Sequence, residues 1–182
     1  FVFQAGESLI GAFVNAEACA QVVLRTAGNE AQRGADHGFL AGDDTDSHID
    51  TLARLCPNDT IVYVKCEDKS DEHYDALKAM ETELQQFQTL SKQPYRLIPL
   101  PMAKPCYDEE GTRLPATYAN YLVLNQAILY PTYNDLTNDN KAKEQLALAF
   151  PEYEIVGVNC EALIRQHGSL HCATMQYPKF KQ

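Results

Sequence analysis

The order of apolar runs along the chain repeats, and this repetition constrains the fold more than any other feature. The run DTIVYVKC (59–66) is rich in β-branched residues and predicts a buried strand. Apolar residues then recur at helical spacing from Tyr74 to Phe87, which predicts an amphipathic helix with Ser70 as its N-cap. YRLIPLPM (95–102) predicts a second strand. Because such a helix must bury its apolar stripe against a sheet, we expect an α/β fold.

The same order returns in the second half of the chain. ATYANYLVLNQAILYP (116–131) predicts two strands joined by a two-residue hairpin turn at 125–126. NDNKAKEQLALAF (138–150) predicts a helix, and YEIVGVNC (153–160) predicts the strand that follows it. We therefore expect a repeated ββαβ unit and not a single doubly wound sheet.

The charge balance limits the class of partner. The chain has 25 acidic and 15 basic residues, with a formal net charge of −10, and its basic residues form no cluster. Nucleic acid is therefore not the expected partner, because phosphate binding needs a basic face. The acidic balance is compatible with a small cationic substrate, and equally with solubility alone. The sequence contains no signal peptide and no apolar run of about 18 residues, so no membrane partner is expected.

The cysteines do not form a recognisable metal or disulfide framework. Six are scattered along the chain, and none belongs to a C-x-x-C pair. This spacing argues against a structural zinc site. Reduced thiols in a cytoplasmic protein are the simplest interpretation.

An acidic cluster, GDDTDSHID (42–50), is a candidate functional segment. His48 and Asp50 would share one face if the segment were extended. The alternative is a polar loop whose aspartates cap a helix near Thr51. An EF-hand is excluded, because the position of the loop glycine would be Ile49.

A second candidate segment is HGSLHC (167–172). A single cysteine in a strand-like run is usually a small buried hydrophobe, which is one interpretation of Cys172. The other interpretation is a nucleophile, since Gly168 allows close backbone approach and His171 can titrate. In a strand, His171 and Cys172 would point to opposite faces. The working base would then be another histidine, with His48 as the candidate.

Three stretches together resemble a known family. FLAGDDTDSHIDTLAR (39–54), LPATYANYLVLNQAILYPTYND (114–135) and HGSLHCATMQYP (167–178) look like successive motifs of the agmatine deiminase and bacterial peptidylarginine-deiminase-like family. This family belongs to the guanidino-group-modifying superfamily. The resemblance implies a five-bladed α/β propeller of the pentein type, in which each ββαβ unit would be a blade.

The resemblance also bears on the extent of the domain. It covers residues 37–180, whereas residues 1–36 match poorly, since the family's early motif with a Trp and an Arg is absent. The chain begins FVFQAGES without a Met. We therefore interpret residues 1–182 as a single domain that forms the C-terminal part of a deiminase propeller.

By position, the resemblance implies a set of site residues. Cys172 would be the nucleophile and His48 the general acid and base. Asp50 would be a catalytic carboxylate that also grips the guanidinium, and Asp44 would be a further substrate-binding acid. The implied reaction is hydrolysis of agmatine, a small cationic guanidino substrate, to N-carbamoylputrescine and ammonia through a Cys-linked intermediate. It requires no metal and no cofactor.

Two alternatives stay open at the level of sequence. One is deimination of free or peptidyl arginine, whose extra carboxylate would call for a basic residue at the pocket mouth, with Arg54, Arg113 and Arg165 as candidates. The other is a truncated, non-catalytic relative. An incomplete propeller would expose strand edges, so the chain could also form a homo-oligomer.

Overall fold

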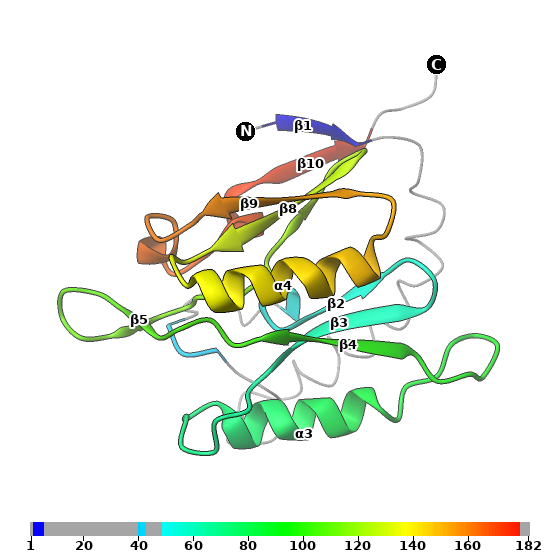
Figure 1. Ribbon diagram of the computed structural model, residues 1–182, viewed down its shortest axis with the longest axis horizontal. Coiled ribbons are helices and arrows are strands. Elements are labelled where there is room, and N and C mark those ends of the chain that lie inside the picture. The colour runs from blue at the N-terminus through cyan, green and yellow to red at the C-terminus, as the bar shows by residue number, and fades with distance from the viewer. Residues whose placement is uncertain (1, 6–39, 43–48, 179–182) are drawn as a thin grey trace.

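The computed structural model describes residues 2–5, 40–42 and 49–178, and these form a mixed α/β structure (Figure 1). Within these ranges, no helix combines the length and the apolar content needed to cross a membrane. The elements in chain order, with η for 3-10 helices, are β1 (Val2–Ala5), η2 (Ile49–Thr51), β2 (Ala53–Cys56), β3 (Thr60–Lys65), α3 (Tyr74–Leu84), β4 (Arg96–Pro101), β5 (Cys106–Tyr107), β6 (Arg113–Leu114), β7 (Leu122–Val123), β8 (Ala127–Thr132), α4 (Leu136–Ala149), β9 (Glu154–Asn159), η3 (Ile164–Gln166), η4 (His171–Ala173) and β10 (Met175–Pro178).

The first ββαβ unit consists of β2, β3, α3 and β4. β2 pairs antiparallel with β3, and β3 pairs parallel with β4 across the α3 crossover. The turn between β2 and β3 holds Asn58 and Asp59 at φ 57° and 51°, a left-handed conformation that Asn and Asp tolerate better than most residues. β3 is the central strand, and its residues from Thr60 to Val64 are all buried, as expected for a strand covered on both faces. The predicted strand at 59–66 is confirmed.

The second unit, built from β7, β8, α4 and β9, has the same topology. β7 pairs antiparallel with β8, and β8 pairs parallel with β9 across α4. The amide of Leu124 donates to the carbonyl of Ala127 at 2.8 Å, which closes the predicted two-residue turn at 125–126. The repeated ββαβ pattern is therefore a property of the structure.

Helix α4 lies between the two units. It contacts β9 of its own unit and also β4 of the first unit, whereas α3 packs on β3 at the other side of the first sheet (Figure 1). The buried residues Ala142, Leu146 and Ala149 of α4 belong to one continuous apolar cluster that spans both units. The two sheets therefore share a core.

Both helices begin at residues other than those predicted. Ser70 does not cap α3, because its amide and its hydroxyl both donate to the Asp68 carboxylate, at 2.9 and 2.6 Å. α4 begins earlier than the predicted range, because the Asp135 side chain accepts from the amide of Asn138 at 3.3 Å. A capping side chain competes with local turns for the same amides, and the apolar pattern does not show which of them wins.

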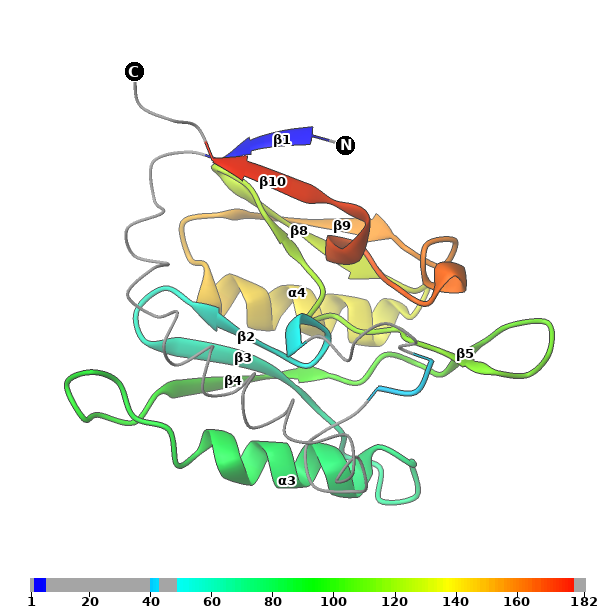
Figure 2. The ribbon, with the colours of Figure 1, turned by 180° about the vertical axis from the view of Figure 1, so that it is seen from behind.

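Two smaller strand pairs complete the structure. β5 pairs antiparallel with β6, and β1 pairs parallel with β10, which brings segments near the two chain ends together (Figure 2). Between β6 and β7, every residue from Leu114 to Leu122 is buried. The first strand predicted within 116–131 is thus mostly an irregular buried linker, with only Leu122–Val123 paired. This linker carries a residue of the candidate site.

Candidate active site

Cys172 lies in the short turn η4, which leads into β10 (Figure 2). The prediction that Cys172 lies in a strand is wrong, so the alternation of a strand does not apply to His171 and Cys172. The chain makes a single 3-10 turn over His171–Ala173 before it becomes extended. In this turn the amides of His171 and Cys172 both donate to the side-chain oxygen of Asn120, and the His171 amide also donates to the main-chain carbonyl of Asn120 at 3.1 Å.

Cys172 is the exposed thiol among the described cysteines. Cys56, Cys66 and Cys160 are buried, and Cys106 is half-buried. Burial raises the pKa of each of these four thiols, that of Cys160 to about 11, because a thiolate is poorly solvated in an apolar environment. Thiolate chemistry is therefore disfavoured at these four positions.

Asp50 is half-buried in η2, and its carboxylate is held by two side chains. Its Oδ2 atom accepts from Nδ2 of Asn120 at 2.9 Å and lies 2.7 Å from Nδ1 of His171. An ionised carboxylate can only accept, so the His171 ring donates from Nδ1. Because η2 is a 3-10 helix, Asp50 is not part of the extended segment considered above, nor does it cap a helix at Thr51.

Asn120 connects the two predicted site residues. Its side chain is completely buried. Its Oδ1 atom accepts from the amides of His171 at 2.8 Å and Cys172 at 3.2 Å, while its Nδ2 group donates to Asp50. One side-chain amide therefore joins the acid of η2 to the backbone of the cysteine turn.

The glycine in the HGSLHC segment has a local function. A Cβ atom on Gly168 would lie 3.0 Å from Cβ and 3.6 Å from Sγ of Cys172. The sequence suggested close approach between this backbone and a ligand, and the approach observed is to Cys172 itself. The preceding residue, His167, has a left-handed φ of 62°, and its Nδ1 lies 3.0 Å from the carbonyl oxygen of Gly42.

His48 and Asp44 lie outside the described residues. The structure does bring Asp50 and Cys172 together through Asn120, and it describes both flanks of the 43–48 segment. On one flank is η2, which contains Asp50. On the other flank, the turn at 40–42 is held by hydrogen bonds at Ala41 and Gly42.

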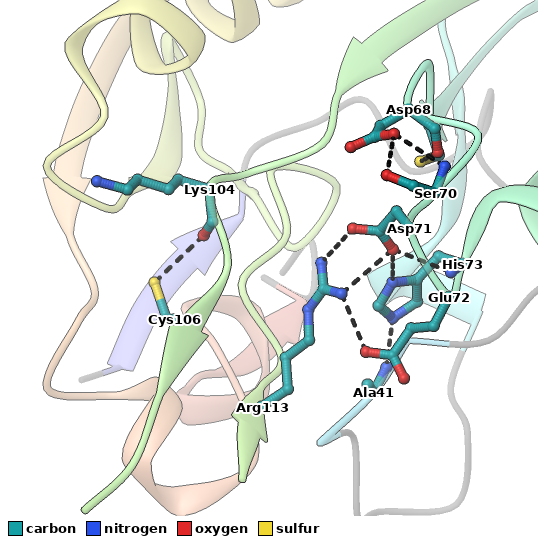
Figure 3. A network of polar contacts seen from close by, with 10 residues as sticks. Ala41, Asp68, Ser70, Asp71, Glu72, His73, Lys104, Cys106 and Arg113 are labelled. Carbon is teal, nitrogen blue, oxygen red and sulfur yellow. Dashed lines mark hydrogen bonds and ion pairs between the residues drawn. The ribbon is translucent and has the colours of Figure 1, made fainter. Parts of the chain in front are cut away.

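A polar network supports this turn from the side of α3 (Figure 3). The amide of Ala41 donates to Nε2 of the buried His73 at 2.8 Å, so Nδ1 of this ring carries the proton that it shares with Asp71 at 2.6 Å. Arg113 reaches both oxygens of Asp71, at 3.2 and 2.9 Å, and also Glu72 at 3.0 Å. Burial alone would raise the pKa of Asp71, but the hydrogen bonds from Arg113 and His73 outweigh it and hold this pKa well below its usual range.

The three arginines considered for an arginine substrate all have partners within the protein. Arg54 donates to the carbonyl of Tyr121 and lies 4.4 Å from the centroid of that ring. Arg113 belongs to the Asp71 network. Arg165 is largely exposed and lies 3.6 Å from Glu109.

The sequence did not indicate that Asn120 and His171 would contact Asp50. Asn120 lies 70 residues from Asp50 and 52 from Cys172 along the chain, so no local spacing indicates the contact. The available signal was its position inside ATYANYL, an apolar run in which a buried amide must find a hydrogen-bond partner.

The family model described as Porphyromonas-type peptidyl-arginine deiminase matches residues 14–178. A protein of Marinomonas sp. (strain MWYL1) named "Putative agmatine deiminase" is 32% identical over 156 residues, which are 77% of this chain and 42% of that protein.

Two solved structures are also similar. The "Putative Arginine Deiminase" of Porphyromonas gingivalis superposes with a TM-score of 0.75 at 57% identity, over 79% of this chain and 42% of that one. A C. jejuni agmatine deiminase with substrate bound superposes with a TM-score of 0.66 at 45% identity, over 75% of this chain and 39% of that one. The chain thus spans about two fifths of the length of these relatives. Because the family model matches most of the length of this chain, the chain belongs to the Porphyromonas-type peptidyl-arginine deiminase family.

Proposed function

We propose that the protein containing this chain hydrolyses the guanidino group of agmatine to give N-carbamoylputrescine and ammonia. Cys172 is the nucleophile, His48 is the general acid and base, and Asp50 with Asp44 holds the cation. The observation that carries the proposal is the contact of Asn120 with both the Asp50 carboxylate and the Cys172 backbone. The similarity to named agmatine and arginine deiminases supports the same class of reaction.

The substrate class follows from what the site offers. A guanidinium ion is planar, positively charged and able only to donate hydrogen bonds. A carboxylate matches it with charge-assisted, bidentate hydrogen bonds. Asp50 is half-buried and oriented by Asn120 and His171, so an oriented acceptor is available that Asn120 joins to the Cys172 backbone.

The reaction divides into two covalent steps. The Cys172 thiolate attacks the guanidinium carbon, a C–S bond forms, and the C–N bond to the departing ammonia breaks as His48 supplies a proton. His48 then removes a proton from water, which attacks the thiouronium carbon and displaces the thiolate to leave the ureido product. A thiolate is a stronger nucleophile than water, and each assisted proton transfer contributes about 10²–10⁴-fold to the rate.

The Cys172 amide argues against an acyl substrate. Cysteine hydrolases of acyl groups commonly direct backbone N–H donors at an oxyanion. Here the Cys172 amide donates to Asn120. A guanidinium substrate develops no oxyanion and needs acceptors, which agrees with the acidic partner found at this site.

Arginine is the second candidate substrate, because one similar structure is named an arginine deiminase and the family name refers to peptidyl arginine. The ammonium end of agmatine needs no basic residue, whereas the carboxylate of arginine does. Arg54 and Arg113 both have protein partners, and this favours agmatine.

The test is ammonia release by the complete protein from agmatine, free arginine and a peptide with a C-terminal arginine. Agmatine turnover at an ordinary enzymatic rate, about 1–10³ s⁻¹, with little from arginine is expected. Preferential release from either arginine compound would make the protein an arginine deiminase. No release from any of the three would indicate a non-catalytic relative.

The proposal also covers the complete fold, the cellular compartment and the binding partners of the protein. We infer that the two ββαβ units are blades of a five-bladed propeller that longer relatives complete. The five described cysteines are all free thiols, which supports the reducing cytoplasm as the compartment. The partner is a small guanidino compound, with homo-oligomer formation where strand edges stay exposed.

A further inference from the structure

A completely buried asparagine side chain destabilises the folded state unless its amide group finds hydrogen-bond partners. Asn120 sits in the buried linker between β6 and β7, where an apolar residue of similar shape would meet the packing requirement alone. Its amide instead makes three hydrogen bonds, two at Oδ1 and one at Nδ2. An unsatisfied buried amide is strongly disfavoured, so this side chain is stable here only with both segments in place.

The geometry requires an amide and no other group of that size. Oδ1 faces two N–H donors of the η4 turn, and Nδ2 faces the Asp50 carboxylate. An aspartate at this position would keep the acceptor but set two carboxylates against each other. A leucine would keep the volume and lose all three hydrogen bonds.

Asn120 is itself fixed by its neighbours in the linker. The Thr117 hydroxyl donates to the carbonyl of Thr51 at 2.6 Å, directly after Asp50. The Tyr133 hydroxyl contacts both main-chain polar groups of Thr117, at 3.0 and 2.9 Å, and lies 2.7 Å from Oγ of Ser169 in the cysteine loop. The linker is therefore tied to η2 on one side and to the cysteine loop on the other.

We propose that Asn120 is a positioning residue of the deimination: one amide sets the spacing between the acid that holds the guanidinium and the thiol that attacks it. This inference rests on the proposed function for the roles of Asp50 and Cys172. Asn120 does not touch the substrate. It acts through two partners that it holds at once, so its loss should disturb substrate binding and thiol chemistry together.

The first experiment compares Asn120→Leu and Asn120→Asp with the complete wild-type protein. Both variants are expected to lose about 10²-fold in kcat/KM, the size of effect that follows misplacement of reacting groups by about 1 Å. In Asn120→Asp, the added negative charge should also move the acidic limb of the kcat/KM profile to higher pH, because it disfavours ionisation of Asp50. Because the added charge alone can move this limb, the loss of kcat/KM in the uncharged Asn120→Leu variant is the measurement that reports on positioning.

Tyr118→Phe is the matched control. Tyr118 lies in the same buried linker and donates one buried hydrogen bond, to Asp139 of α4 at 2.7 Å. Its loss should lower Tm but change kcat/KM by no more than about twofold. If Tyr118→Phe lowered kcat/KM as much as Asn120→Leu did, Asn120 would be acting through the stability of the linker and the proposal would fail.

Two readouts separate this proposal from the proposed function. Agmatine affinity can be measured in the Cys172→Ala background, and the rate of Cys172 alkylation by iodoacetamide can be followed at one fixed pH without any substrate. Asn120→Leu, which adds no charge, should weaken agmatine binding and change the alkylation rate, because it releases both the Asp50 carboxylate and the Cys172 backbone. If the wild-type protein proved inactive while the alkylation rate still changed in Asn120→Leu, the reaction would be wrong and the positioning role right.

The proposal is overturned if a folded Asn120 variant keeps the kcat/KM and the Cys172 alkylation of the wild-type protein. Asn120→Asp retains the acceptor for both η4 amides, so it provides the test even if Asn120→Leu does not fold. Wild-type kcat/KM together with a wild-type alkylation rate in Asn120→Asp would show that Asn120 positions neither partner.

Discussion

Single residues at this site gain their properties from contacts distant in sequence. Cys172 is exposed in a 3-10 turn, whereas burial raises the pKa of the other described thiols. Asp50 is oriented by His171, which is 121 residues away along the chain. Reactivity at the residue scale is thus set by the turn that presents the thiol and by the side chains that fix the acid.

The first prediction concerns the nucleophile. Cys172→Ala should abolish ammonia release while Tm stays near that of the wild type, because the thiol is exposed and fills no core volume. Cys66→Ala should leave turnover largely unchanged and lower Tm, since Cys66 is buried. A haloacetamidine reagent followed by peptide mass mapping should label Cys172 ahead of Cys66. Full turnover by the Cys172 variant would refute the assignment.

The second prediction concerns the pH dependence of stability. The folded state lowers the pKa of Asp71, so this carboxylate stabilises the fold above its unfolded pKa, about 3.9, and the contribution disappears as the pH falls further. Asp71→Asn should therefore cost about 1–3 kcal/mol at pH 7, with a Tm difference that shrinks below about pH 4.

Glu72→Gln is the control for this prediction, because Glu72 is the exposed partner of the same Arg113. It should change stability by no more than about 1 kcal/mol. A Tm difference for Asp71→Asn that stayed constant from pH 7 down to pH 3 would rule out the ionised pair as its cause.

At the scale of elements, the periodic parts of the chain were predictable. Apolar spacing identified α3, although the predicted stripe ran three residues past its observed end at Leu84. Apolar runs rich in β-branched residues identified β3 and β9 within one residue of their observed ends. The turn at 172 was not predictable from the local pattern of "HCATMQ", because hydrogen bonds to the distant Asn120 hold its amides. The buried linker was mistaken for a strand for a related reason: its polar groups are satisfied by side chains and not by a ladder.

The third prediction compares two glycines with the same φ of +82°. A Cβ atom on Gly42 would lie 2.1 Å from the carbonyl oxygen of Arg113, whereas a Cβ atom on Gly111 would meet no atom within 4 Å. Gly111→Ala should cost only the left-handed strain of about 1–2 kcal/mol. Gly42→Ala should cost more, and it should also lower kcat/KM, because it displaces the turn that leads into the segment of His48. Equal losses of Tm in the two variants would show that the turn can shift freely.

At the scale of the whole molecule, the matched part of the chain accounts for about two fifths of the length of the relatives. The proposed propeller would close only with every blade present, and an open one would expose strand edges and apolar faces. The resemblance identified the family from three motifs, but it could not indicate which side chains complete the site, because those contacts depend on how segments distant in sequence pack together.

The fourth prediction follows from this incompleteness. The 182 residues expressed alone should self-associate or show little deiminase activity, whereas the same residues within a protein of the relatives' full length should be active. Gel filtration combined with an ammonia assay distinguishes these results. A monodisperse monomer of the isolated chain that turned over agmatine at about 1–10³ s⁻¹ would contradict the prediction.

The position of α4 has a consequence for how the chain opens. Because α4 contacts both β4 and β9, neither ββαβ unit can separate without uncovering the core of the other. Amide hydrogens in β3 and β8, the central strands of the two sheets, should therefore exchange with solvent in a single cooperative opening and not in two independent ones. In exchange experiments the two repeats would behave as one foldon, although their topology repeats.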